Sequence, residues 1–216
     1  MIFEDWGLID YQQALDKQLG YVEKVAADDK HPGFLIFCTH PPVVTTGRQS
    51  TPEDIFAWKG PVIEISRGGK ATYHGPSQVV VYPILNLKNP RAGRGPQEIR
   101  GYLRALEQAI VDTLAVYGVE AIGRTPQKIP GQAAATDETG VWIGERKIAS
   151  LGIAVKKWIT YHGAAINVLY DPEAFIGMNP CGFKASTMLS LEQQINQKPN
   201  VEEFKKNLRE RCEQLL

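Results

Sequence analysis

Apolar residues recur at three- and four-residue steps in three segments, which is the spacing of one face of an α-helix. The first segment follows Asp10, a residue suited to capping a helix N-terminus. The second has Pro96 near its start and Gly118 just past its end. The third follows Asn200, with Glu203 three residues later as in a capping box. We therefore predict three amphipathic helices with these apolar stripes: Tyr11, Ala14, Leu15, Leu19, Val22 and Val25; Ile99, Leu103, Leu106, Ile110 and Leu114; Val201, Phe204, Leu208, Cys212 and Leu215.

Short runs of β-branched and aromatic residues between these helices predict strands. The predicted strands cover residues 34–38, 43–46, 62–65, 78–87, 141–143, 147–155 and 158–168. Residues 144–146 form a turn that makes a hairpin, and Asp171-Pro172 is expected to open a short helix. Residues 123–140, rich in Thr, Pro, Gly, Gln and Ala, predict a mobile surface loop. The pattern indicates an α+β protein with a mixed, largely antiparallel sheet flanked by helices, and the length suits a single domain over residues 1–216.

Composition and charge exclude several classes of protein. The chain has 24 Lys and Arg against 24 Asp and Glu, and 43% of its residues are apolar, which is ordinary for a globular protein. Zero net charge without long basic runs argues against a nucleic-acid partner. No apolar stretch is long enough to span a membrane, and the N-terminus lacks the pattern of a signal peptide. Three cysteines without a Cys-x-x-Cys pair fit a reducing compartment, so we expect a cytoplasmic protein.

Residues 67–76 carry the first candidate for chemistry. Gly68 and Gly69 allow a ligand to approach the backbone, and Arg67, Lys70 and His74 supply polar groups beside them. The alternative is a surface β-turn beside a salt bridge. The spacing fits neither a Walker A loop nor a dinucleotide-binding fingerprint.

The second candidate is Cys181, which lies between turn-forming neighbours in Asn179-Pro180-Cys181-Gly182. Such a turn can hold a thiol at a defined angle and leave it accessible, whereas a cysteine of unknown role is most often a small core residue. Cys38 and Cys212 occupy apolar positions and are predicted to be core residues.

Lys147 becomes relevant because a cysteine nucleophile needs an activator. An ordinary thiol has a pKa near 8.5 and is mostly protonated at neutral pH, and a nearby ammonium favours the thiolate. Without such a partner, a lysine at the start of a strand is expected to be solvated.

The sequence contains no motif typical of a metal site or of a serine hydrolase. Cys38 and His40 offer only two ligands, no zinc-type spacing occurs, and we predict no metal. No Gly-x-Ser-x-Gly motif is present.

Taken together, the motifs resemble those of the octanoyltransferases of lipoic acid biosynthesis. Each motif alone is short, but the ordered set is specific and spans residues 34–190. The matching segments are HPPVVTTG at 40–47, RGGKATYHGPSQ at 67–78, YPILNL at 82–87, GVWI at 140–143, KIASLG at 147–152, YHGAAINV at 161–168 and NPCG at 179–182.

This resemblance implies the fold of the biotin and lipoate protein ligase catalytic domains, without a cofactor. It implies transfer of an octanoyl group from octanoyl-acyl carrier protein to a lysine of lipoyl domains, in E2 subunits of 2-oxoacid dehydrogenases and in the glycine cleavage H protein. Cys181 matches the family's acyl-thioester nucleophile and Lys147 its partner lysine. The segments that match substrate contacts are Arg67, Gly68, Gly69, Lys70, Ala71, Thr72, Tyr73, His74, Ser150, Leu151, Gly152, His162, Gly163, Ala164 and Ala165.

Two other functions stay open at this point. An ATP-dependent lipoate or biotin ligase of the same fold would use the glycine loop and the lysine without needing Cys181. A catalytically silent module would only bind an acyl chain or its carrier. One departure concerns Ser77, where the family usually has glycine; a left-handed backbone there would strain the serine.

Overall fold

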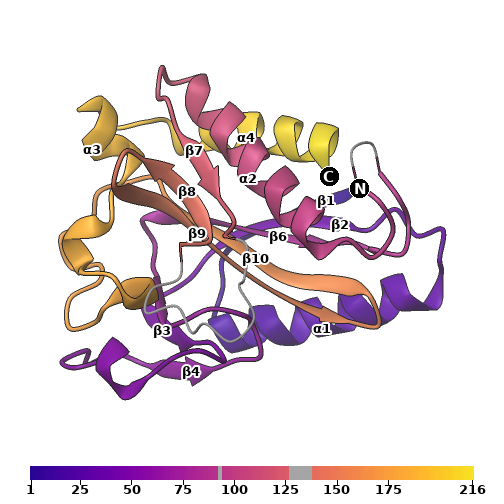
Figure 1. Ribbon diagram of the computed structural model, residues 1–216, viewed down its shortest axis with the longest axis horizontal. Coiled ribbons are helices and arrows are strands. Elements are labelled where there is room, and N and C mark those ends of the chain that lie inside the picture. Colours follow the sequence, from indigo (N-terminus) through magenta and orange to yellow (C-terminus); the bar gives the residue numbers. More distant parts are fainter. Residues whose placement is uncertain (92–93, 127–137) are drawn as a thin grey trace.

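The computed structural model of the chain describes residues 1–91, 94–126 and 138–216. In these residues a large sheet has the strand order β1-β2-β6-β10-β9-β8-β7, and a small sheet has the order β4-β3-β5 (Figure 1). Neighbouring strands are antiparallel except for the pairs β1–β2 and β3–β4. The strands are β1 (Ile2–Leu8), β2 (Phe34–Thr39), β3 (Val43–Thr46), β4 (Val62–Glu64), β5 (Thr72–His74), β6 (Gln78–Ile84), β7 (Ile122–Arg124), β8 (Gly140–Ile143), β9 (Arg146–Lys156) and β10 (Ile159–Asn167). The helices are α1 (Tyr11–Ala27), α2 (Ile99–Ala115), α3 (Leu191–Ile195) and α4 (Val201–Leu215), with short 3-10 turns η1 (Pro52–Asp54), η2 (Pro180–Gly182) and η3 (Ala185–Thr187).

Helices cover both faces of the large sheet. Figure 1 shows α1 on one side and α2 with α4 on the other. Strand β2 illustrates the consequence, because Leu35 and Phe37 face one helix layer and Phe34, Ile36 and Cys38 face the other. A strand buried on both faces is apolar throughout, which explains why its run lacks alternation.

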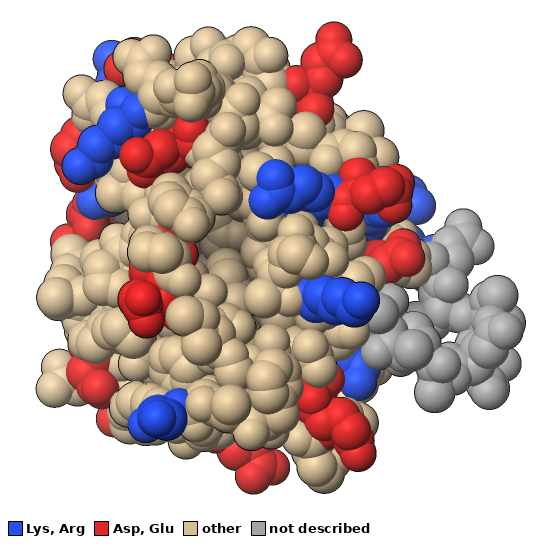
Figure 2. All heavy atoms as spheres, turned by 90° about the vertical axis from the view of Figure 1, so that its left-hand side faces the viewer, with Lys and Arg blue, Asp and Glu red and all other residues tan. Residues whose placement is uncertain are grey.

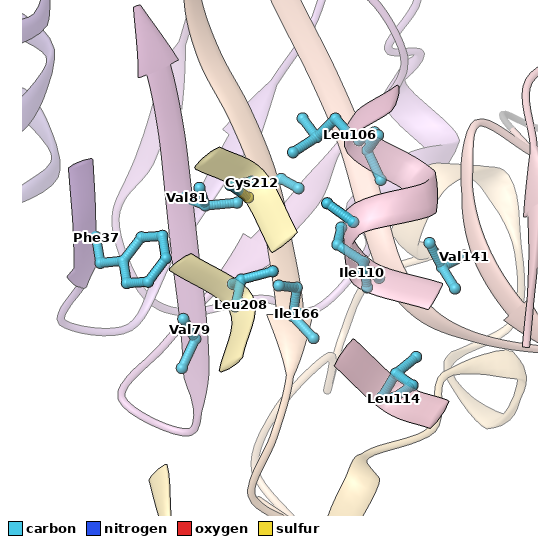
Figure 3. Packing of buried hydrophobic residues seen from close by; sticks show 14 of the residues in the cluster. Phe37, Val79, Val81, Leu106, Ile110, Leu114, Val141, Ile166, Leu208 and Cys212 are labelled. Atoms are coloured by element: carbon cyan, nitrogen blue, oxygen red, sulfur yellow. The ribbon is translucent and has the colours of Figure 1, made fainter. Parts of the chain in front are cut away.

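The larger core lies between the sheet and the α2–α4 layer. Figure 3 shows Leu208 and Cys212 of α4 beside Ile110 of α2, above Val81 and Ile166 of the central strands. The smaller core packs the apolar face of α1 on the other face of the same strands. The prediction that Cys38 and Cys212 are core residues is confirmed, since their exposed fractions are 1% and 0%.

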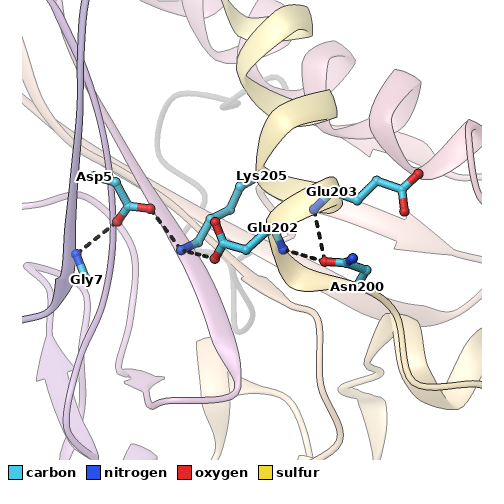
Figure 4. A network of polar contacts seen from close by, with 6 residues as sticks. All are labelled: Asp5, Gly7, Asn200, Glu202, Glu203 and Lys205. Atoms are coloured by element: carbon cyan, nitrogen blue, oxygen red, sulfur yellow. Dashed lines mark hydrogen bonds and ion pairs between the residues drawn. The ribbon is translucent and has the colours of Figure 1, made fainter.

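The predicted N-caps Asp10 and Asn200 are confirmed, whereas α2 begins only at Ile99, three residues after Pro96, with Glu98 as its N-cap. The Asp10 carboxylate accepts from the Gln13 N–H at 3.1 Å, and the Asn200 amide oxygen accepts from Glu202 and Glu203. Gly118 has a φ of 71° just past α2. Close to the capped end of α4, Lys205 contacts Asp5 of β1 at 2.9 Å, which ties the edge strand to this helix (Figure 4).

Several elements differ from the sequence-based expectations. Residues 172–177 form turns where a short helix was predicted. Strands β1, β5 and β7 and helix α3 were not predicted; β1 is an edge strand and β5 has only three residues, so their apolar signals are weak. Of the predicted loop at 123–140, residues 127–137 lie outside the described residues. Among the described helices, none has the length and apolarity to cross a bilayer.

The surface charges are dispersed. On the face in Figure 2, which lies at the left of Figure 1, basic and acidic side chains are scattered over a mostly uncharged surface. The picture agrees with the zero net charge of the sequence.

Candidate functional site

A narrow pocket lies on the α1 side of the large sheet. It holds about 390 Å³ of empty space, including its open mouth. Its lining residues come from α1, β5, β6, β9, β10 and η2, together with the loop before β5. They are Tyr11, Arg67, Thr72, His74, Val80, Tyr82, Ser150, Leu151, Gly152, His162, Gly163, Ala164, Ala165 and Cys181.

Cys181 lines this pocket from the η2 turn. Its backbone has a φ of 56°, a left-handed conformation that is uncommon for a residue with a side chain. The Cys181 N–H donates to the Ala71 carbonyl at 2.7 Å, beside β5. Its thiol donates to the Ser150 hydroxyl on β9 at 3.5 Å. The residue is 4% exposed, so the accessible thiol expected from the sequence is instead a buried thiol that faces a pocket.

A β-bulge sets the direction of Lys147 on β9. The pairing between β8 and β9 shifts by one residue, and both Ile148 and Ala149 join the core under α2 and α4. As a result Lys147 and Ser150 both project to the other face of the sheet.

Two aromatic rings lie near the ammonium of Lys147, a residue that is fully buried rather than solvated. It lies 5.5 Å from the ring centre of Trp142 and 5.8 Å from that of Phe183. Phe183 is two residues beyond Cys181, so this contact brings the lysine to the cysteine turn. Lys147 itself does not line the pocket.

The residues of β5 alternate between two environments. Thr72 and His74 face the pocket, whereas Tyr73 points to the opposite side and packs on Trp58 and Phe175. The alternation of side chains along a strand explains the division. Gly68, Gly69, Lys70 and Ala71, also predicted as site residues, lie outside the pocket lining.

Arg67 lines the pocket at the start of the glycine loop. Its guanidinium donates to the Thr45 carbonyl at 2.9 Å, to the Thr45 hydroxyl at 3.0 Å and to the Gly68 carbonyl at 2.9 Å. Gly152 provides room for the arginine, since a Cβ there would lie 2.9 Å from Arg67 Cδ. Arg67 is 6% exposed, so its positive charge is largely removed from water.

His162 sits in the middle of β10 with a φ of 58°. Its N–H leaves the strand ladder and donates to the Gln18 side chain of α1 at 2.8 Å. The next residue, Gly163, lies so close to β6 that an added Cβ would be 2.0 Å from the Val81 carbonyl. Gln18 was not predicted as a site residue. Its position four residues after Ala14 places a polar side chain on the buried stripe of α1, and this could have indicated a buried hydrogen bond.

Buried polar side chains pair with one another at and beside the pocket near α1. His40 donates from Nδ1 to the Ile9 carbonyl at 2.8 Å and accepts from the Tyr82 hydroxyl at Nε2, also at 2.8 Å. Tyr11 and His162 approach to 3.5 Å between hydroxyl and Nδ1. Tyr11 and Tyr82 were not predicted as site residues, because Tyr11 belongs to the apolar stripe of a predicted helix and Tyr82 to a predicted strand.

Burial keeps the pocket histidines neutral. It lowers the pKa of His40, lowers that of His74 well below its usual value, and lowers the pKa of His162 to about 3, with the positive charge of Arg67 acting in the same direction on His74 and His162. The neutral imidazole is therefore the favoured form at neutral pH, and among the described residues His74 Nδ1 and His162 Nε2 are buried without a hydrogen-bond partner.

The backbone at Ser77 is not left-handed, so the strain considered for it does not arise. The Ser77 hydroxyl donates to Asp171 at 3.5 Å. Within the residues that the structure describes, no three His, Cys, Asp or Glu side chains come together as a metal site. The sulfur of Cys38 lies 3.5 Å from His40 Nε2, the nitrogen that accepts from Tyr82.

Comparisons with known proteins agree with one another. The lipoyl protein ligase A/B catalytic domain family matches residues 10–213. An octanoyltransferase of Bdellovibrio bacteriovorus is 54% identical over 217 residues, covering 100% of this chain and 99% of that protein. An octanoyltransferase of Pelobacter propionicus is 36% identical and covers 100% of this chain and 95% of its own length.

Solved structures share the fold at low sequence identity. A lipoate-protein ligase A bound with ATP superposes with a TM-score of 0.70 at 16% identity, over 99% of this chain and 83% of the other. A biotin protein ligase from Aquifex aeolicus, in complex with biotin and ATP, gives 0.56 at 11% identity, over 99% and 69%. An archaeal bipartite lipoate protein ligase from Thermoplasma acidophilum, studied with its E2 lipoyl domain, gives 0.55 at 16% identity, over 99% and 82%.

Proposed function

Because the chain belongs to the octanoyltransferases of the lipoyl protein ligase A/B catalytic domain family, it is an acyltransferase of lipoate biosynthesis, and we propose that it moves an octanoyl group from acyl carrier protein to a lysine of a lipoyl domain. The observation that carries this proposal is Cys181, which has a left-handed backbone and lines the pocket with its thiol. Strained backbone at a reactive side chain is typical of functional sites. We also propose that residues 1–216 act as one catalytic domain.

In the first step the Cys181 thiolate attacks the octanoyl thioester carbonyl. The bond from the carbonyl carbon to the carrier sulfur breaks, and the carrier leaves as a thiol after taking one proton. Lys147 is our candidate for the group that favours the thiolate, because it contacts the ring of Phe183 next to the cysteine turn.

In the second step the acceptor lysine attacks the acyl-cysteine. The amine loses a proton, the amide bond forms, and the Cys181 sulfur leaves. Lys147 is our candidate for taking that proton. The path from thioester to thioester to amide is downhill, so the reaction needs no nucleotide. This feature separates it from the ligase alternative, in which ATP activates a free acid.

The small residues of β10 offer a place for the octanoyl tail. Gly163, Ala164 and Ala165 line the pocket without large side chains. Burial of the tail contributes roughly 0.8 kcal/mol per methylene.

The partners follow from the reaction. We propose octanoyl-acyl carrier protein as donor, and the lipoyl domains of 2-oxoacid dehydrogenase E2 subunits and the glycine cleavage H protein as acceptors. The archaeal ligase studied with its E2 lipoyl domain supports such an acceptor for this fold. All three cysteines are free, which fits our proposal of a reducing cytoplasmic setting.

Intact-mass measurement of the protein with octanoyl-acyl carrier protein, without nucleotide, tests the nucleophile. We expect one added octanoyl mass that hydroxylamine removes, and no addition to Cys181→Ser under the same conditions. Replacement of Cys212, which is buried in the larger core between the sheet and the α2–α4 layer, by alanine provides the matched control and should leave the labelling intact. Labelling that survives in Cys181→Ser would exclude the assigned nucleophile, and a strict need for ATP would favour the ligase.

A further inference from the structure

The turn that carries Cys181 is held by two separate segments of the chain. On one side, the Asn179 N–H donates to the Asp54 carbonyl at 2.8 Å, and the Asn179 side-chain amide donates to the Glu53 carbonyl at 3.0 Å. On the other side, the Cys181 N–H donates to the Ala71 carbonyl at 2.7 Å. The conformation of the turn therefore depends on the distance between η1 and the start of β5.

A buried ion pair joins those two segments. Lys70 Nζ lies 3.6 Å from one carboxylate oxygen of Asp54, and the two side chains are only 10% and 4% exposed. The other carboxylate oxygen of Asp54 accepts from the Thr51 N–H at 2.8 Å, which fixes the carboxylate within the η1 turn. Lys70 directly precedes Ala71, so the pair links the two residues, Asp54 and Ala71, whose carbonyls hold the cysteine turn.

We propose that the Lys70–Asp54 pair is a clamp that positions the Cys181 nucleophile. The clamp rests on the proposed function only in that Cys181 is the reacting group. Cys181 and Gly182 both have left-handed backbones, with φ of 56° and 80°. A residue with a side chain keeps this conformation only where its surroundings impose it. The clamp supplies that constraint, because it holds together the two segments whose carbonyls accept from the N–H groups of Asn179 and Cys181.

This role differs from the substrate contact implied for Lys70 by the family resemblance. The Lys70 ammonium points to Asp54, and Lys70 is not part of the pocket lining. Both members of the pair are therefore positioning residues, which act on the reaction through the turn.

The test uses variants that separate position from stability. Asp54→Asn or Lys70→Met alone leaves one buried charge without its partner and destabilises the whole protein. The double variant Asp54→Asn with Lys70→Met removes both charges, and the asparagine oxygen can still accept from Thr51. Lys70→Arg keeps the pair. Lys205→Met is the matched control, because it breaks a distant ion pair between α4 and β1 (Figure 4).

Two measurements are made on the full chain. The first is the rate of iodoacetamide alkylation at each cysteine, followed by peptide mass spectrometry, with Cys38 and Cys212 as internal reporters of global opening. The second is kcat and KM for transfer from octanoyl-acyl carrier protein. In the double variant we expect alkylation of Cys181 to rise at least about tenfold while Cys38 and Cys212 stay protected. We expect kcat to fall at least about tenfold with KM within about twofold, because a small displacement of a reacting atom slows the chemical step.

Lys70→Arg, which keeps the ion pair, should retain the wild-type alkylation rate of Cys181 and the wild-type kcat. Lys205→Met should change neither quantity. The clamp is wrong if the double variant keeps wild-type alkylation and kcat, or if all three cysteines lose protection in parallel. If the wild type transfers no octanoyl group while Cys181 alone becomes exposed in the double variant, the proposed function fails and the clamp stands.

Discussion

Two pocket residues, Cys181 and His162, adopt left-handed backbone conformations that cost residues with a Cβ roughly 1–2 kcal/mol. Each conformation serves a contact. At Cys181 it turns the N–H to Ala71 and the thiol to Ser150, and at His162 it turns the N–H out of the sheet toward Gln18. The flanking Pro180 and Gly182 predict a turn around the cysteine, but nothing in the local sequence predicts the backbone of His162.

Replacement of Lys147 by methionine tests its role at the scale of one residue. Methionine keeps most of the apolar stem against Trp142 and removes the charge. We expect kcat to fall by about 10²–10⁴-fold, because a group that moves protons in both steps is lost. We also expect the pH–rate profile to move to higher pH, since the thiolate then forms without a nearby positive charge.

Stopped-flow or steady-state kinetics between pH 6 and pH 9 would show both effects. Lys147→Arg is the matched control for retained charge, and it should keep the position of the profile. A profile for Lys147→Met that coincides with the wild type would rule out the activating role.

Strands β6 and β10 approach each other unusually closely on the wall of the pocket. Gly163 of β10 faces the Val81 carbonyl without room for a side chain. Beyond it, Pro83 of β6 has no N–H to donate, and the Thr160 hydroxyl donates to the Pro83 carbonyl while accepting from the Leu85 N–H. The backbone pairing of β6 with β10 is therefore interrupted near Pro83, and the Thr160 side chain supplies hydrogen bonds in its place.

Two glycine-to-alanine substitutions separate the effect of this close packing on stability from the effect of helix propensity. Gly163→Ala should lower the free energy of unfolding by about 1–3 kcal/mol, because the backbone of β6 must shift to admit a methyl group. Gly20→Ala, on the exposed side of α1 with open space around it, should raise that free energy by about 0.5–1 kcal/mol. Chemical denaturation of both variants gives the comparison, and equal effects would show that Val81 does not constrain the site.

At the scale of the whole molecule, the pocket joins residues as distant in sequence as Tyr11 and Cys181. Two buried histidines, His74 and His162, line it together with Arg67. Proton uptake by these two histidines is less favourable in the folded state than in the unfolded chain, because burial and the charge of Arg67 oppose it.

This arrangement predicts how stability depends on pH. Above pH 7 the histidines are neutral in both states and contribute no slope. As the pH falls below about 6.5, the unfolded chain binds protons that the folded chain refuses, so the free energy of unfolding falls. For His162, whose folded-state pKa is about 3, the loss continues down to about pH 3 at roughly 1.4 kcal/mol per pH unit.

Denaturant titrations at several values between pH 7.5 and pH 4.5 measure this slope. His162→Asn removes one titrating group with a residue that tolerates the left-handed backbone. Between pH 6 and pH 4.5, the free energy of unfolding of this variant should change less steeply with pH than that of the wild type. The difference in slope should correspond to about one proton, which is roughly 1.4 kcal/mol per pH unit. Equal slopes would mean that His162 takes up its proton in the folded state.

The α1, α2 and α4 helices, the hairpin β8–β9 and the turn around Cys181 were predictable from the sequence, because periodicity, caps and turn residues act over a few positions. The ordered motifs also carried the resemblance to the octanoyltransferases. The tertiary structure alone decided which of those residues meet. The bulge on β9 turned Lys147 to the face of Ser150, and the alternation of β5 divided Thr72 and His74 from Tyr73. These outcomes depend on strand register and on contacts between distant segments, which no local pattern encodes.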